Sequence, residues 1–388
     1  MPVASIDALY NTVERLGCVQ IDTLQMVRRS QYLVLWSRLG TFNPADLDRL
    51  QFDPKDRRLF EGWQHAASII PSTEYRFQMP HQRYLREKPN GWFQDWINQP
   101  EHPELMSKVL DRIRREGAVK VADFEYNGPK RGGWWDWKPV KTALEYHYAF
   151  GDLMITNRLN FQRVYDLTER VLPPWANRAE PSTDERNRYW IERASIALGI
   201  CMPAQIAEYA FMKREVARPY VEELVKEGTL VPVKADLVDG KEHELLVHKN
   251  QLPKLEQASD GELQSLRTTF LSPFDSLFWA RNRDQQFWKF RHILEAYKPA
   301  PKRIWGYFCL PILHQNRLVG RFDPKLERKS GRLRIKTIYL EPDIPPDEVL
   351  AADVATAMRD FLSFHQAGDL IVEQSFPPDF GRRFLAAL

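Results

Sequence analysis

Cysteine is scarce in this sequence, and its three positions lie far apart. Cys18, Cys201 and Cys309 each stand beside apolar neighbours, and none belongs to a Cys-x-x-Cys pair. That spacing argues against a disulfide framework, a structural zinc site and an iron–sulfur cluster. We predict that each cysteine is a small residue of a hydrophobic core.

Long hydrophobic runs are also missing. No segment approaches the run of about 18 apolar residues that a membrane helix needs, and the N-terminus has no basic region leading into an apolar stretch. We therefore expect a protein without membrane contact, located in the cytoplasm and associated with the nucleoid.

The chain has little excess of either charge. Its 55 Lys and Arg residues nearly balance its 52 Asp and Glu residues, which leaves a net charge of +3. Composition alone therefore does not indicate a nucleic-acid-binding protein, and a DNA-binding surface would need basic residues clustered on one face. Several enzyme motifs are absent: the Walker and dinucleotide glycine-rich loops, His-Glu-x-x-His, Gly-x-Ser-x-Gly and the zinc deaminase pattern.

Two stretches of the chain repeat one order of predicted elements. Each has a helix, a short helix, a longer helix that ends at a glycine, and a β-hairpin, which is the order of a winged helix. A chain of 388 residues is expected to form roughly two to four modules. We predict an α+β fold of tandem winged-helix units and a C-terminal β-rich, barrel-like module. The predicted parts are a first unit at 1–78, a linker at 79–103, winged helices at 104–175 and 186–252, and the β-rich module with a closing helix at 265–388.

The most informative segment is Val19–Thr23. If it is extended, the amide of Gln20 and the carboxylate of Asp22 lie on one face, because side chains alternate along a strand. An amide can position a water molecule, and a carboxylate can polarise that water or stabilise a developing positive charge. Alternatively, Asp22 is only the N-cap of the next helix, predicted from Thr23 to Leu39. Arg28 and Arg29 on that helix can hold a phosphodiester.

Basic residues of the second predicted unit are candidates for DNA contact. Lys138 and Lys141 begin its longer helix, which reads DNA in many winged helices, and Arg158 and Arg163 flank the tip of its hairpin. The alternative for all four is an ordinary solvated surface. The tryptophans at 134–137 favour core packing.

The C-terminal module has a second candidate contact. His314 and Arg317 border a turn at Gln315-Asn316 and can donate hydrogen bonds into a groove, although the turn is equally consistent with plain surface. The segment Lys325–Arg334 is rich in basic residues and is a further candidate for electrostatic contact.

Taken as a whole, the sequence resembles the winged-helix DNA glycosylases of the AlkZ and YcaQ/AlkX type, which include interstrand crosslink repair enzymes. Gln20-Ile21-Asp22 matches their catalytic motif in its Gln-x-Asp form, and Trp63-Gln64-His65-Ala66-Ala67 matches their W-x-H-x-A element, with Ala66 where relatives carry Glu. The resemblance extends to Leu271–Asp275 and to Val319–Arg321. Relatives have an additional N-terminal helix before the segment that corresponds to Ser5.

This resemblance implies a C-shaped DNA-binding surface and hydrolysis of the N-glycosidic bond of N7-alkylated purines in duplex DNA, including crosslinked ones. It implies that Gln20 and Asp22 are catalytic and that Trp63 and His65 are auxiliary residues near the site. It also implies a monomer that needs no metal or organic cofactor. The competing hypotheses are a winged-helix regulator, which would prefer a DNA sequence and cleave nothing, and a structural protein without salt-dependent DNA affinity.

Overall fold

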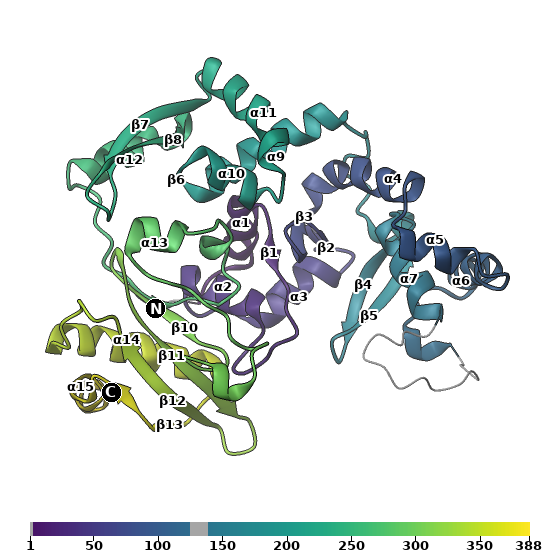
Figure 1. Ribbon diagram of the computed structural model, residues 1–388. Helices are drawn as coiled ribbons and strands as arrows, with labels where there is room; N and C mark the ends of the chain where they lie inside the picture. The colour runs from purple at the N-terminus through teal and green to yellow at the C-terminus, as the bar shows by residue number, and fades with distance from the viewer. Residues whose placement is uncertain (1–2, 125–138) are drawn as a thin grey trace. The chain divides into compact units, whose positions relative to one another are not determined.

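Figure 1 shows the protein as a computed structural model, in which residues 3–124 and 139–388 are described. The chain forms two compact units. The first contains the residues up to Pro44, the segment Gln64–Ser68 and the residues from Asn187 to Leu388, and the second contains Ala45–Trp63 and Ile69–Arg186. The residues of the predicted first unit, 1–78, are therefore divided between the two.

The first unit opens with helix α1 (Ile6–Leu16) and the short strand β1 (Val19–Gln20). The Ser5 hydroxyl caps α1 by accepting the Ala8 N–H at 3.2 Å, as a serine at this position should. After β1, the backbone N–H of Ile21 donates to the carbonyl of Ala67 at 2.8 Å. This bond fixes the segment that leads to Asp22.

Helix α2 (Ser30–Leu39) begins later than we predicted. The carbonyl of Met26 accepts the backbone N–H of Leu326, and the carbonyl of Val27 accepts the guanidinium of Arg328. Residues 23–29 therefore form a loop, because their backbone groups bond to a distant strand and not within a helix.

The middle of the chain confirms the predicted order of helices and hairpin. Its elements are α9 (Thr183–Leu198), β6 (Ile200–Cys201), α10 (Pro203–Tyr209), α11 (Arg214–Lys226), β7 (Leu230–Asp236) and β8 (Glu242–His248). The strands form a sheet in the order β6-β8-β7. One core unites these elements, with Ile206 and Leu224 from the helices against Leu246 from β8.

The C-terminal part of the first unit is a sheet covered by helices (Figure 1). Its elements, after η3 (Lys249–Gln251) and α12 (Leu252–Ser259), are β9 (Thr268–Phe270), η4 (Ser276–Phe278), α13 (Arg283–Trp288), η5 (Ala300–Lys302), β10 (Leu310–His314), β11 (Arg317–Glu327), β12 (Arg332–Leu340), α14 (Glu348–His365), β13 (Asp369–Val372), β14 (Ser375–Phe376) and α15 (Pro378–Ala387). The predicted turn at Gln315-Asn316 is confirmed.

Two predictions for this module were wrong. Among the described strands, the order is β13-β12-β11-β10-β9 with β13 and β9 at the edges, so the sheet is open and is not a barrel. Helix α14 buries Val354, Met358 and Phe361 at helical spacing, so an open sheet can form a core by packing against it. In addition, α14 does not close the chain, because β13, β14 and α15 follow it.

The second unit combines several helices and the hairpin at 153–167 with the strand Leu59–Trp63 and the part of the strand Ala67–Pro71 from Ile69 onward. Its elements are α3 (Pro44–Phe52), β2 (Leu59–Trp63), β3 (Ala67–Pro71), η1 (Ser72–Gln78), α4 (Met79–Glu87), α5 (Gly91–Ile97), α6 (His102–Glu116), η2 (Val121–Asp123), α7 (Pro139–Ala149), β4 (Leu153–Leu159), β5 (Gln162–Leu167) and α8 (Thr168–Val171). The predicted linker at 79–103 is wrong, since α4 and α5 occupy most of it. Phe93 and Trp96 of α5 are buried in the core with Ile113 and Leu144.

The three cysteines are buried, as predicted, and their thiols form no disulfide; burial raises the pKa of the Cys201 thiol to about 12. In the described part of the chain, no helix has both the length and the apolar character that a membrane crossing requires.

Candidate active site

Asp22 lies just after β1 and is half-buried. Its Oδ1 accepts the backbone N–H of Leu24 at 2.8 Å, which is an Asx turn. The interpretation of Asp22 as a helix N-cap is wrong, because α2 begins only at Ser30 with Arg29 in the N-cap position. The carboxylate is therefore oriented by its own loop, and no helix depends on it.

Burial and hydrogen bonding act on the Asp22 carboxyl in opposite directions. Burial raises its pKa from the ordinary value of 3.8, while the backbone N–H groups of Leu24 and Thr23 lower it, and burial prevails. Burial raises the pKa of the Tyr297 phenol, and the negative charge of Asp22 raises it further. Sequence reasoning missed Tyr297, because no motif surrounds it.

The loop between Asp22 and α2 is fixed at several points. The N–H of Leu326 donates to Met26 at 2.8 Å, and the Arg328 guanidinium donates to Val27 at 2.9 Å. Arg28 lies over the ring of Phe364 at 4.8 Å and donates to the Phe364 carbonyl at 3.4 Å. Such anchoring holds the carboxylate in one place, which electrostatic catalysis requires.

Gln20 ends β1 and is partly exposed. It lies two residues before Asp22, which follows the end of the strand, so the predicted shared face of the amide and the carboxylate stays a prediction. The partly exposed amide is accessible to a water molecule.

His65 lies in the segment Gln64–Ser68, which also provides the Ala67 carbonyl that pairs with Ile21. Its imidazole stacks on Trp279 with ring centres 4.2 Å apart and parallel planes, and the edge of Phe211 lies 5.3 Å away. Burial lowers the pKa of His65 to about 4, so the ring is neutral at physiological pH. Among the described residues, its buried Nδ1 has no hydrogen-bond partner. Trp63, the other auxiliary candidate, belongs to the second unit, where half of its surface is exposed.

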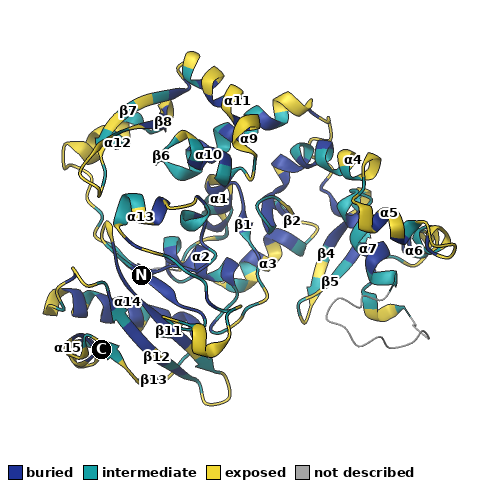
Figure 2. Ribbon diagram, viewed as in Figure 1, coloured by how far each residue is buried: buried dark blue, intermediate teal, exposed yellow. Residues whose placement is uncertain are grey.

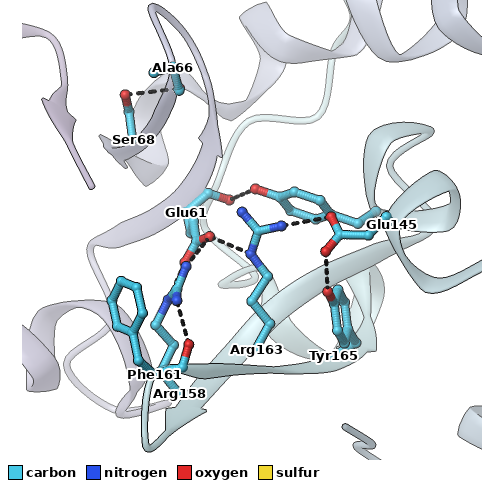
Figure 3. Close-up of polar contacts among 9 residues, drawn as sticks. Glu61, Ala66, Ser68, Glu145, Arg158, Phe161, Arg163 and Tyr165 are labelled. Carbon is cyan, nitrogen blue, oxygen red and sulfur yellow. Dashed lines mark hydrogen bonds and ion pairs between the residues drawn. The ribbon is translucent and has the colours of Figure 1, made fainter. Parts of the chain in front are cut away.

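A buried ion-pair network occupies the second unit and includes both predicted hairpin arginines (Figure 3). Arg158 donates to the two carboxylate oxygens of Glu61 at 2.7 and 2.8 Å, and Arg163 bridges Glu61 at 2.9 Å and Glu145 at 2.7 Å. Tyr165 donates its hydroxyl to Glu145 at 2.9 Å. The two arginines and two glutamates balance in charge, so we no longer propose Arg158 and Arg163 as phosphate contacts.

Burial and charge within this network shift the pKa values of Arg163 and Tyr165. Burial opposes the charge of Arg163, but Glu61 and Glu145 outweigh that effect and raise its pKa. Burial raises the pKa of Tyr165, and Glu145 raises it further. The sequence signal for Glu61 was a single acid within the otherwise apolar strand Leu59–Trp63, which we did not interpret.

The remaining basic candidates fall in different environments. Lys141 lies in the first half of α7 and is partly exposed, whereas Lys138 lies outside the described residues. His314 is mostly buried and bonds Thr268 at 2.9 Å, so it does not project from its turn. The Arg317 side chain is 61% exposed, and its Nη2 lies 3.6 Å from Oδ2 of Asp343. Arg317 is therefore accessible to a phosphate. Arg29 is partly buried before α2.

Two of the five basic residues in the segment Lys325–Arg334 are in ion pairs. Arg334 bonds Glu327 and Glu373, and Arg332 bonds Asp369. Within the described residues, no group of three or more His, Cys, Asp or Glu side chains has the arrangement of a metal site.

Comparison with known proteins identifies the class of protein to which this chain belongs. The family model described as "DNA glycosylase AlkZ-like" matches residues 13–364. That match covers nearly the whole chain and defines it as a DNA glycosylase, an enzyme that acts on DNA. The chain belongs to the AlkZ-like family of these enzymes.

A solved structure shows the same fold. The chain is similar to Streptomyces sahachiroi DNA glycosylase AlkZ, with a TM-score of 0.59 and 14% sequence identity. The similarity covers 95% of this chain and 93% of the other. The family membership excludes the regulator and the structural protein that we considered from sequence.

Proposed function

We propose that this glycosylase hydrolyses the N-glycosidic bond of N7-alkylated purines in duplex DNA and unhooks interstrand crosslinks formed through them. The observation that carries the proposal is Asp22, a half-buried carboxylate oriented by the Leu24 N–H at the end of the strand that carries Gln20. A fixed carboxylate in a partly desolvated site stabilises positive charge more strongly than one in water.

The chemistry suits a cationic base. A purine alkylated at N7 carries a positive charge, so the C1′–N9 bond breaks with its electron pair moving to the base, which leaves neutral. The sugar then carries oxocarbenium character, which the Asp22 carboxylate stabilises. Water adds to C1′ and loses a proton. The Asp22 carboxylate either accepts this proton or polarises the O–H bond of the water. We propose that the Gln20 amide positions this water and that neutral His65 is an auxiliary contact.

The DNA-binding elements follow from the repeated order of helices and hairpins. We propose that residues 104–175 and 186–252 are winged helices and that residues 265–388 form a further module. Lys141, Arg317, Arg28 and Arg29 are the described basic residues that we propose as phosphate contacts, together with Lys138. Duplex DNA is the partner, and we propose that the enzyme acts at the nucleoid as a monomer.

The test is a denaturing gel with two duplexes. One contains a single N7-methylguanine and the other a single N7-guanine interstrand crosslink. We expect abasic sites in the first and separated strands with abasic sites in the second, with no product from undamaged DNA. Product from the monoadduct duplex alone would support hydrolysis of N7-alkylated purines and would contradict crosslink unhooking. No product from either duplex, with a folded protein, would reject the proposed substrates.

Replacing Gln20 by Ala is expected to lower the single-turnover rate on N7-methylguanine by roughly 10- to 100-fold, because a water-positioning group is lost. The dissociation constant for DNA should stay the same. Gln251→Ala, a change in the same unit, is the control for general effects of removing an amide. An unchanged rate in Gln20→Ala would show that the amide does not position the water.

The pH dependence should report the raised pKa of Asp22. Since the ionised carboxylate is the active form, the rate is expected to fall as the pH drops, with a midpoint above the ordinary 3.8. His65 has its pKa near 4, so its replacement by Gln should not move that midpoint. Single-turnover rates between about pH 4 and pH 8 measure this, after subtraction of the spontaneous rate. A midpoint at or below 3.8 would contradict the burial of the catalytic carboxylate.

A further inference from the structure

Phe211 is an exposed aromatic residue in an unusual backbone conformation. It occupies the turn between α10 and α11, where 71% of its surface is exposed and its φ is +52°. A bulky side chain at positive φ is strained, and a less bulky residue such as glycine or asparagine would be the easier choice. Strained positions of this kind cluster at functional sites.

The Phe211 ring is nevertheless oriented. Its edge meets the imidazole of His65 with ring centres 5.3 Å apart, and His65 stacks on Trp279. Trp279 packs in turn against Tyr209 at 5.0 Å, and its indole N–H donates to the Phe274 carbonyl. The Phe211 ring therefore contacts an aromatic cluster through His65, while most of its surface is open to solvent.

Hydrogen bonds tie this turn to the strand of the active site. Tyr209, two residues before Phe211, donates its hydroxyl to the Leu16 carbonyl at 2.7 Å, at the end of the helix that leads into β1. His65 lies in the segment whose Ala67 carbonyl pairs with Ile21, next to Asp22. Phe211 is thus connected to both sides of the segment that carries the catalytic pair.

Cations outnumber acids in the segment around Phe211, although Arg214 is paired with Glu208 and Glu215 is also exposed. Lys213, Arg214 and Arg218 follow it and are exposed at the start of α11, whose outer surface is largely solvent-accessible (Figure 2). An apolar residue flanked by cations suits duplex DNA, because the cations can contact phosphates while the ring enters between bases. An apolar protein partner would not require this flanking charge.

We infer that Phe211 is a wedge that enters the base stack of duplex DNA beside the lesion. It opens the neighbouring base step so that the glycosidic bond of the damaged nucleotide faces Asp22. Phe211 is a positioning residue and takes no part in bond breaking. This inference rests on the proposed function for its substrate, but insertion itself is a property of DNA binding.

Because Phe211 has a positive φ, glycine can replace it without straining the backbone. Phe211→Gly removes the ring at a position where glycine fits better than phenylalanine, so the melting temperature should stay within about 4 °C of the wild type. Phe211→Tyr keeps an aromatic ring. Leu385→Ala, which truncates an exposed apolar side chain on α15, is the matched control.

Two measurements test the wedge. In the first, single-turnover rates on N7-methylguanine duplex should fall roughly 10- to 100-fold in Phe211→Gly, as expected for loss of a stacking contact, and stay near wild type in Phe211→Tyr and Leu385→Ala. In the second, 2-aminopurine is placed beside the lesion and the proteins carry Asp22→Asn to prevent reaction. Its fluorescence should rise on binding, and this rise should be lost with Phe211→Gly.

The outcomes separate the wedge from the proposed function. If wild-type protein hydrolyses the lesion and Phe211→Gly matches it in both rate and fluorescence, the wedge is overturned and the function stands. If wild-type protein fails to hydrolyse N7-methylguanine but the fluorescence rise depends on Phe211, the substrate is wrong and the wedge is supported. The salt dependence of binding should be the same in all variants, because no charge changes.

Discussion

Asp22→Asn is expected to lower the single-turnover rate on N7-methylguanine by about 100- to 1,000-fold, the loss typical of removing one preorganised electrostatic group. The carboxylate charge that stabilises the oxocarbenium-like sugar disappears, and an amide cannot accept the proton of the attacking water. Because the asparagine oxygen can still accept the Leu24 N–H, the Asx turn should persist. DNA affinity should therefore be retained.

This expectation is checked by rates and binding measured on one duplex. Fluorescence anisotropy gives the dissociation constant, and thermal melting confirms that the variant is folded. Asp379→Asn is the matched control, since Asp379 is an exposed acid on α15 that pairs with Arg382. A rate for Asp22→Asn within tenfold of wild type, or equal losses in both variants, would remove Asp22 from the catalytic role.

Glu61→Gln is expected to destabilise the protein by about 3–5 kcal/mol. The Glu61 side chain is fully buried and accepts hydrogen bonds from both Arg158 and Arg163 (Figure 3). Glutamine has nearly the same volume, so the loss comes from charge and not from a cavity. The buried guanidinium of Arg158 would then lose its carboxylate partner, while Arg163 would keep Glu145.

Urea unfolding followed by tryptophan fluorescence measures this loss, with the transition of the second unit resolved if the two units unfold separately. Glu104→Gln is the control, since the Glu104–Lys108 pair has a similar distance of 2.7 Å but is 68–69% exposed. Its removal should leave the free energy of unfolding nearly unchanged, because solvent screens an exposed ion pair. Equal destabilisation by the two substitutions would mean that burial does not strengthen the Glu61 network.

Short-range sequence patterns predicted much of the fold. A hairpin was predicted after the longer helix of each repeated stretch, and β4–β5 and β7–β8 are found there, because a glycine after each helix and the alternation along each strand are local signals. The argument for Gln20 and Asp22 assumed that Val19–Thr23 is extended, and β1 covers Val19 and Gln20 of that segment.

The errors arose where distant residues decide the local structure. Met26 and Val27 suggested a helical face, but their carbonyls bond residues about 300 positions later. Similarly, nothing local indicates that Glu61 meets Arg158 and Arg163, which follow it by 97 and 102 positions. The helices at 79–97 were different, since Asn90 caps α5 and was a local signal that we overlooked.

The anchoring of the catalytic loop has a consequence for biosynthesis. Leu326, Arg328 and Phe364 all hold residues 26–28, so the ribosome must translate most of the chain before the loop that follows Asp22 has its native partners. A nascent chain released early would carry the catalytic motif without the contacts that orient it. We therefore expect glycosylase activity to arise only after residues 326–364 have been synthesised.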